Sequence, residues 1–409
     1  MSETILPKDW KWFRLKDICE VVTGTTPSKS DLSNYGNEIP FFKPPHLWDG
    51  LISETEEMLS SKGATKARVV PPNTVLVTCI GNLGRTGFVK KEAAFNQQIN
   101  AILENDKIDG KYIFYQAQSP FFKNQLEKLA TGTTVSIVNK GNFETINIPV
   151  APLKTQQAIV SKIEELFSEL DKGIEDLKTA QQQLKTYRQS VLKWAFEGKL
   201  TNENVKDGEL PKGWEWSNVK DISTLLGDGL HGTPKYDING EYYFINGNNL
   251  NDGKIEIKEN TKTVSKEEFE KYKKQLNDKT IFVSINGSLG YTAFYNNEPV
   301  ILGKSACYFN VKEGINKHYI RYIFTSQRFT NYSTTVATGS TIKNVSLKSM
   351  REFEIPLPPT LEEQHRIVQE IESRLSVADK MEESIAQSLQ QAETLRQSIL
   401  KKAFSGELV

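Results

Sequence analysis

The chain has few of the residues that most often carry redox or metal chemistry: of 409 residues, only 3 are cysteine and 4 are histidine. Cys19, Cys79 and Cys307 are odd in number, far apart and in no CxxC pair, which argues against a disulfide framework or a zinc site. The histidines show no metal-ligand spacing. We therefore expect reduced, buried thiols in a cytoplasmic protein that holds no metal.

The sequence also lacks an excess of either charge and any long apolar run. Lys+Arg and Asp+Glu are equal at 51 each, which counts against a free-standing nucleic-acid binder, although a local patch or a charged partner can supply affinity. No stretch approaches the ~18 apolar residues of a membrane span. The first ten residues lack the basic-then-apolar layout of a signal peptide. These features predict a soluble chain of two to four domains.

Catalytic motifs are missing as well. The glycine run Gly81-Asn-Leu-Gly84 lacks the lysine that a phosphate-binding loop requires, so we interpret it as a turn. Lys43-Pro-Pro-His46 has a Pro-Pro pair without the preceding Asn of an adenine methyltransferase motif, which favours a loop. The sequence predicts a protein that is not itself an enzyme.

What the sequence does contain is a tandem repeat. Residues 188–200, RQSVLKWAFEGKL, return at 396–408 as RQSILKKAFSGEL, with nine of thirteen positions identical at an offset of 208. The repeat extends into the preceding blocks, where Gly24-Thr-Thr-Pro27 matches Gly232-Thr-Pro234 and Thr131-Gly132 matches Thr338-Gly339. The chain is therefore predicted to run block, helix, block, helix.

Each copy of the repeat ends a segment with seven-residue apolar spacing, which is typical of a coiled coil. The stripe residues that we expect at the interface of a helix pair, or with a partner, are Ile163, Leu170, Leu177, Leu184, Val191, Ile371, Ile385 and Ile399. A second stripe lies three residues further on and includes Tyr187 and Trp194. Each helix would be about 40 residues, or about 60 Å, long. Gly198 and Gly406 fit helix C-termini. Burial of the two stripes against each other predicts an antiparallel pair, with the blocks related by a pseudo-two-fold axis.

The blocks are predicted to be mixed α+β. Residues 74–80 and 280–285 are β-branched or apolar runs that end in glycine turns, which indicates strands. Residues 109–118 and 316–325 have helical spacing, and the charged stretch 262–274 is interpreted as a solvated helix face. The domain boundaries that follow are 1–151 and 206–358 for the blocks, and 152–205 and 359–409 for the helices.

With these motifs in place, the whole chain resembles the specificity subunits of type I restriction-modification systems, in which two target-recognition domains alternate with two helical regions. Residues 356–364, PLPPTLEEQ, carry the family's helix entry, whereas the first half departs from it, with Thr155 in the position of Glu363. The resemblance implies a DNA-binding subunit whose two recognition domains each read one half of a bipartite double-stranded site. It also implies two modification subunits docked on the helices, with motor-nuclease subunits added for cleavage. S-adenosylmethionine would be bound by the modification subunits and no cofactor by this chain.

Base reading requires polar side chains in loops, such as Arg or Lys for guanine and Asn or Gln for adenine. In the first block the candidates are Thr25, Thr26, Lys29, Lys43, Arg85, Thr133 and Thr134. In the second they are His231, Thr233, Lys235, Asn246, Asn248, Asn249, Tyr291, Ser340, Thr341 and Lys343. The alternative is a tandem-repeat coiled-coil scaffold that binds protein or a small ligand and no DNA.

Overall fold

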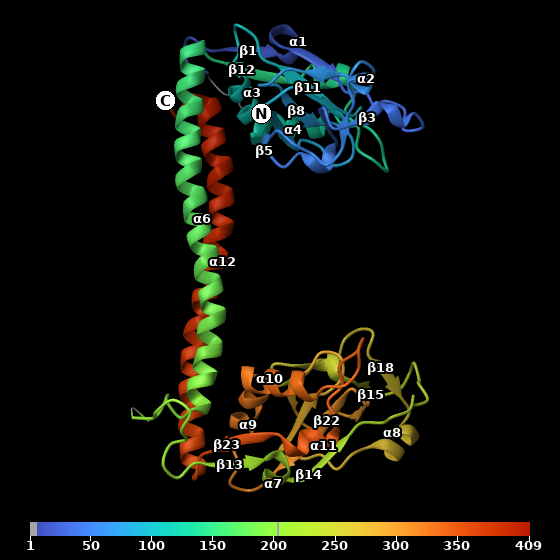
Figure 1. Cartoon of the computed structure of the whole chain (residues 1–409), viewed down its shortest axis with the longest axis vertical. Helices are drawn as coiled ribbons and strands as arrows, with labels where there is room; N and C mark the ends of the chain where they lie inside the picture. The colour runs from blue at the N-terminus through green and yellow to red at the C-terminus, as the bar shows by residue number, and fades with distance from the viewer. Residues whose placement is uncertain (1–5, 203) are drawn as a thin grey trace. The chain divides into compact units, whose positions relative to one another are not determined.

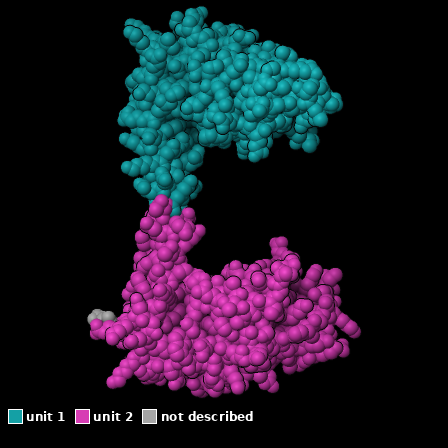
Figure 2. Space-filling view, in the orientation of Figure 1, with its two compact units in different colours: residues 1–178, 386–409 teal, residues 179–385 magenta. Residues whose placement is uncertain are grey.

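The structure, a computed structural model, describes residues 6–202 and 204–409. The chain divides into two compact units (Figure 2): unit 1 comprises residues 1–178 and 386–409, and unit 2 comprises residues 179–385. Each unit contains an α/β body and a helix pair to which both long helices contribute a segment.

In the described part of unit 1, the body has three sheets, five short α-helices and two 3₁₀ helices, η1 (Leu32–Asn34) and η2 (Pro44–His46). The sheets, in strand order, are β1 (Lys11–Arg14)–β12 (Asn147–Val150); β3 (Tyr35–Gly36)–β6 (Met58–Leu59)–β4 (Ile39–Phe42)–β10 (Ala93–Phe95)–β7 (Val69–Val70); and β2 (Glu20–Thr23)–β11 (Ile99–Leu103)–β8 (Val75–Thr78)–β9 (Thr86–Val89)–β5 (Gly50–Ile52). The helices are α1 (Leu15–Ile18), α2 (Ser61–Ala64), α3 (Gly110–Gln118), α4 (Pro120–Lys128) and α5 (Lys140–Phe143).

The body of unit 2 repeats most of this arrangement. Its sheets are β13 (Glu215–Asn218)–β23 (Glu354–Leu357); β14 (Ser223–Asp228)–β22 (Ala306–Val311)–β19 (Thr280–Ser284)–β20 (Thr292–Phe294); β18 (Lys262–Val264)–β15 (Tyr242–Ile245)–β21 (Val300–Leu302); and β16 (Leu250–Asn251)–β17 (Lys254–Ile255). Its helices are α7 (Val219–Ile222), α8 (Lys266–Tyr272), α9 (Lys317–Phe324), α10 (Gln327–Val336) and α11 (Leu347–Glu352).

Corresponding strands of the two bodies pair in the same way. β8 pairs antiparallel with β11 and β9, as β19 does with β22 and β20. β4 is antiparallel to β6 and parallel to β10, and β15 has the same relation to β18 and β21. The predicted duplication and the mixed α/β class are confirmed.

Local sequence explains the core elements. β8 and β19 are buried along their whole length, which suits their apolar, β-branched composition. α3 begins after Asp109, whose carboxylate accepts from Tyr112 N at 3.0 Å, and α9 begins after Asn316, which caps it in the same way. One expectation was wrong: residues 262–264 form strand β18, because they pair with β15, and only 266–272 are helical.

The long helices are α6 (Leu153–Phe196) and α12 (Leu361–Ser405), of 44 and 45 residues. Gly198 and Gly406 follow them with φ of 76° and 82°, which is the left-handed C-terminal conformation that glycine favours. Each of these glycines lies against the proline near the start of a body, Gly198 against Pro211 and Gly406 against Pro7. A Cβ on Gly198 would lie 2.1 Å from Pro211 Cγ, and one on Gly406 would lie 2.2 Å from Pro7 Cγ.

Within each unit the helix segments run antiparallel (Figure 1). In unit 1, Arg396 of α12 pairs with Asp171 of α6 and covers the ring of Phe167 at 4.3 Å. In unit 2, Arg188 of α6 pairs with Asp379 at 2.7 Å and Glu382 at 2.9 Å. Arg188 and Arg396 open the two copies of the repeated segment, so the repeat conserves one interhelical ion pair.

The seven-residue stripe is largely buried, as predicted. Six of its members are buried and two are half-buried: Ile163, Leu184, Val191, Ile371, Ile385 and Ile399 in the first group, Leu170 and Leu177 in the second. The prediction of a second apolar stripe was only partly right, since the side chains of Tyr187 and Trp194 are 36% and 40% exposed. Phe167 and Ala195 are buried instead, because near its ends each helix also packs a second face against the adjacent body.

Candidate nucleic-acid interface

Four loops of unit 1 meet where strands of its two larger sheets end: residues 24–26, 79–85, 96–98 and 131–137. Backbone hydrogen bonds tie the first loop to the end of β10, and the second loop to the third and the fourth. Thr25 N donates to Phe95 O at 3.0 Å, Cys79 N to Gln98 O at 2.8 Å, and Gly81 N to Ser136 O at 2.9 Å. We call these four loops loop cluster 1.

Unit 2 has the corresponding arrangement, which we call loop cluster 2: residues 229–234, 285–291, 303–305 and 338–344. Here Leu230 N donates to Leu302 O, at the end of β21, at 2.7 Å, Ile285 N to Ser305 O at 2.9 Å, and Gly287 N to Lys343 O at 2.9 Å. The two bodies thus present the same four segments, held by equivalent backbone hydrogen bonds.

Glycines permit this close assembly. A Cβ on Gly24 would lie 2.2 Å from Asn96 O, and one on Gly229 would lie 2.2 Å from Gly303 O, so the first loop can approach the third only without a side chain. In the last loop, Gly132 and Gly339 adopt φ of 99° and 97°. Backbone geometry therefore explains Gly24 and the glycines of both Thr-Gly motifs. In unit 2 the counterpart of Gly24 is Gly229, whereas Gly232 of the Gly-Thr motif has open space around it.

The structure brings many of the predicted base-reading residues together in these clusters. Exposed on loop cluster 1 are Thr25, Thr26, Arg85, Thr133 and Thr134; exposed on loop cluster 2 are His231, Thr233, Tyr291, Ser340, Thr341 and Lys343. His231 is paired with the Asp228 carboxylate, and the Thr26 hydroxyl donates to Gln97 Oε1 at 2.5 Å. The remaining side chains can turn their polar groups to solvent or to a ligand.

Other predicted residues lie outside the clusters. Lys43 is half-buried and paired with Glu57, and Lys235 follows the first loop of unit 2 with an exposed side chain. Asn249 is 4% exposed, and its amide donates to Glu256 O at 2.9 Å, so it cannot reach a base in this structure. Asn246 Oδ1 accepts from Ser305 Oγ at 3.0 Å and supports the third loop, whereas Asn248 is exposed beside it.

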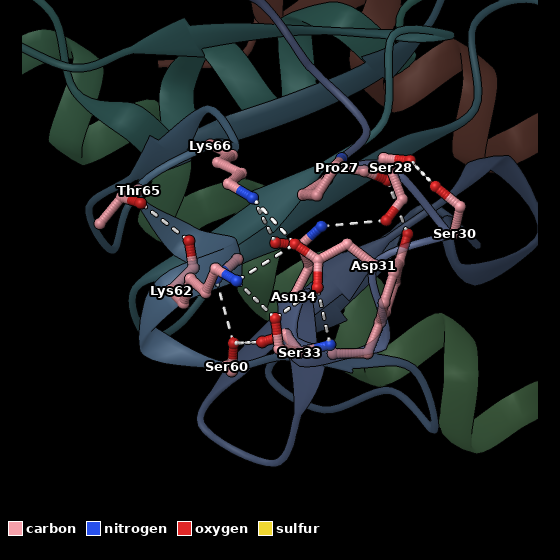
Figure 3. A network of polar contacts seen from close by, with 12 residues as sticks. Pro27, Ser28, Ser30, Asp31, Ser33, Asn34, Ser60, Lys62, Thr65 and Lys66 are labelled. Carbon is pink, nitrogen blue, oxygen red and sulfur yellow. Dashed lines mark hydrogen bonds and ion pairs between the residues drawn. The ribbon is translucent and has the colours of Figure 1, made fainter.

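Lys29 belongs to a segment of unit 1 that a polar network holds in place (Figure 3). Asp31 accepts from Ser33 and pairs with Lys62 and Lys66 at 3.2 Å each, and these partners hold the pKa of its carboxyl below the usual range. Asn34 Nδ2 donates to Ser28 O at 2.9 Å. The network fixes residues 27–35 directly after the first loop, with Lys29 exposed.

Sequence reasoning missed several exposed residues of the clusters. Gln97 and Lys304 are the middle residues of the third loops, and Val135 and Ile342 are apolar side chains, 47% and 59% exposed, in the last loops. The third loops carried no signal, since Asn-Gln-Gln and Gly-Lys-Ser are unlike. The last loops did carry one, because an apolar residue follows the Thr-Gly motif in both halves.

Clusters of metal-binding side chains and exposed thiols are both absent from the described residues. Across 6–202 and 204–409 no group of three or more His, Cys, Asp or Glu side chains could hold a metal ion. The three cysteines are free and buried, as predicted, and burial raises the pKa of each thiol to about 12. In the same residues no helix is both long and apolar enough to cross a membrane.

The fold and the paired loop clusters define a duplicated protein, in which two α/β bodies carry the same set of exposed loops. Residues 7–179 and 211–391 match the model of the type I restriction modification DNA specificity domain. The chain therefore belongs to that family. It is the DNA specificity subunit of a type I restriction-modification system and not a catalytic subunit.

Relatives match over almost the full length. The chain is 27% identical to the StySPI specificity subunit of Salmonella potsdam and 25% identical to the EcoKI specificity subunit of Escherichia coli K12; each match covers 100% of this chain and 91% of the relative. A structure from a study of the assembly and conformational transition of a type I system aligns with a TM-score of 0.76 at 20% identity, covering 98% of this chain and 99% of its own. The HsdS subunit of Thermoanaerobacter tengcongensis aligns with a TM-score of 0.63 at 19% identity, covering 98% of both chains, and these two likenesses support the fold.

Proposed function

We propose that loop cluster 1 and loop cluster 2 each read one half of a bipartite double-stranded DNA site. The observation that carries this proposal is their equivalence: four loops, joined by the same hydrogen bonds, recur in both bodies with different exposed side chains. Equivalent scaffolds with different side chains suit two half-sites of different sequence. Hydroxyl, amide, guanidinium and ammonium groups are those that pair with base edges.

We further propose that the long helices set the distance between the half-sites and dock two modification subunits. Helices α6 and α12, of 44 and 45 residues, are each continuous, and their exposed faces are mostly polar but also carry exposed apolar side chains, among them Trp194, Val377, Met381 and Leu395. The modification subunits supply the methyltransferase activity and bind S-adenosylmethionine, and motor-nuclease subunits join for cleavage. Because the chain has no net charge, partners would provide much of the phosphate contact.

A map of methylated adenines across the genome tests this function, with the gene intact and with it deleted. The proposal predicts that one bipartite methylated motif disappears on deletion. Replacing residues 1–151 with the corresponding block of a relative should then change one half of the motif and leave the other half and the spacing unchanged. An unchanged map after deletion, with partner subunits expressed, would instead favour a scaffold that binds no DNA.

A further inference from the structure

The third loops of the two clusters are equivalent three-residue connectors. Residues 96–98 join β10 to β11 in unit 1, and residues 303–305 join β21 to β22 in unit 2; each connector passes from one sheet of its body to another. In each unit the glycine of the first loop, Gly24 or Gly229, lies against the connector, since a Cβ on it would be 2.2 Å from the carbonyl oxygen of the connector's first residue. These contacts place the middle residues, Gln97 and Lys304, at equivalent positions.

In each connector, hydrogen bonds hold the residues that flank the middle one. In unit 1, Asn96 Nδ2 donates to Gln98 Oε1 at 2.9 Å, and Gln98 N to Asn96 Oδ1 at 3.2 Å. In unit 2, Ser305 Oγ accepts from Gly247 N at 2.7 Å and donates to Asn246 at 3.0 Å. The middle residue is exposed in both. Each connector therefore holds its ends fixed and presents one side chain.

Both side chains present N–H donors. The Gln97 Oε1 atom already accepts from the Thr26 hydroxyl at 2.5 Å, whereas both N–H donors of the amide are without a hydrogen-bond partner among the described residues, so the NH₂ is the group with the most capacity for a ligand. The Lys304 ammonium has three donors and no hydrogen-bond or ion-pair partner among the residues that the structure describes. In the major groove, guanine presents two acceptors, and thymine presents one acceptor and a methyl group. Adenine sets an N–H donor beside its N7 acceptor, which a side chain that offers donors alone does not match.

We propose that Gln97 and Lys304 are equivalent specificity-determining residues, each donating to an acceptor-bearing base, guanine or thymine, in its own half-site. Thr26 is a positioning residue that orients the Gln97 amide. This inference rests on the proposed reading of one half-site by each loop cluster. Beyond that function, it names one base-contacting residue in each unit and the hydrogen-bonding class of the base that this residue contacts. The sequence alone indicated neither.

The test uses the complete complex with its modification subunits and compares Gln97→Ala, Lys304→Ala and Thr26→Val with wild type. The readout is the methylated motif and the binding affinity for duplexes that vary each base of the site in turn. Lys220→Ala is the matched control, since Lys220 is an exposed lysine on α7 outside loop cluster 2. Thermal unfolding of each variant checks that these exposed substitutions leave the fold intact.

The expected result is a loss of discrimination at one guanine or thymine position by about 10- to 100-fold. Gln97→Ala and Lys304→Ala should relax different half-sites, Thr26→Val should relax the same base as Gln97→Ala by a smaller factor, and Lys220→Ala should change nothing. Uniformly weaker binding to all sequences after Lys304→Ala, with a smaller salt dependence, would identify a phosphate contact and overturn the proposal. Unchanged discrimination would overturn it as well. Failure of the proposed function is distinguishable, because the wild-type complex would then show no motif.

Discussion

Gln156 fastens the start of α6 to the body of unit 1, and replacing it tests how each long helix is attached. Its side chain is 0% exposed. Its Oε1 accepts from Asp109 N at 2.9 Å, and its Nε2 donates to Lys107 O at 3.0 Å and Ala151 O at 2.8 Å. Gln156→Met keeps the length of the side chain but removes three hydrogen bonds and leaves three backbone groups without that partner.

At about 1 kcal/mol for each net hydrogen bond, the substitution should lower the stability of unit 1 by about 3 kcal/mol. Gln364 is the equivalent in unit 2, where it accepts from Asn316 N at 2.7 Å and donates to Gly314 O and Pro358 O at 3.3 and 3.5 Å. Because these two donated bonds are long, Gln364→Met should cost less, about 2 kcal/mol.

Hydrogen exchange followed by mass spectrometry measures the opening free energy of each unit separately in the full chain. Gln156→Met should lower protection of α3 and the start of α6, whereas Gln364→Met should do so for α9 and the start of α12. Gln157→Met is the control, since Gln157 is exposed on α6 and should change stability by less than about 0.5 kcal/mol. If Gln156→Met behaves like Gln157→Met, the buried amide does not anchor the helix and the reasoning is refuted.

Three further predictions concern single features of the two units. Glu363 accepts from the Trp214 indole at 2.9 Å, and unit 1 has Thr155 and Trp10 at these positions, so Thr155→Glu should raise the stability of unit 1 by about 1 kcal/mol in hydrogen exchange. No gain would show that the Trp10 indole is out of reach. Leu184→Glu buries a charge in the helix pair and should destabilise unit 2 by about 3 kcal/mol in urea unfolding, more than a charge at an exposed helix position; equal effects would contradict the buried stripe. Because burial raises the pKa of all three thiols to about 12, a thiol reagent at pH 8 should label none in the folded chain and three after denaturation, and fast labelling of the native chain would contradict their burial.

The features that were predictable from the sequence are those that a periodic or repeated pattern records. The heptad stripe identified the long helices, and the Thr-Gly and Gly-Thr motifs identified two loops of each cluster. Backbone geometry requires glycine at Gly24, Gly132 and Gly339, whereas in the second Gly-Thr motif the constrained glycine is Gly229 and not Gly232. The exposure of Trp194 was not predictable, since its heptad position says nothing of the body that packs against the neighbouring face.

The third loops could not be found for a different reason. Gln97 and Lys304 are equivalent only because β10 and β21 occupy the same place in their sheets, and pairing between strands far apart in sequence decides that. Asn249 shows the converse: an Asn in a glycine-rich turn has the composition of a base-reading residue, whereas in this structure its amide donates to Glu256 O and closes the turn.

The division of the chain into units also has a consequence for synthesis. Unit 2 is one continuous segment, residues 179–385, whereas unit 1 needs residues 386–409 to complete its helix pair. As the chain leaves the ribosome, the apolar face of α6 that contains Ile163 and Phe167 remains without Ile399 and Leu400, which are made only after unit 2. Domains usually fold in order from the N-terminus. Here the first body to be synthesised would be the last to finish, and the nascent chain would carry an uncovered helix face throughout the synthesis of unit 2.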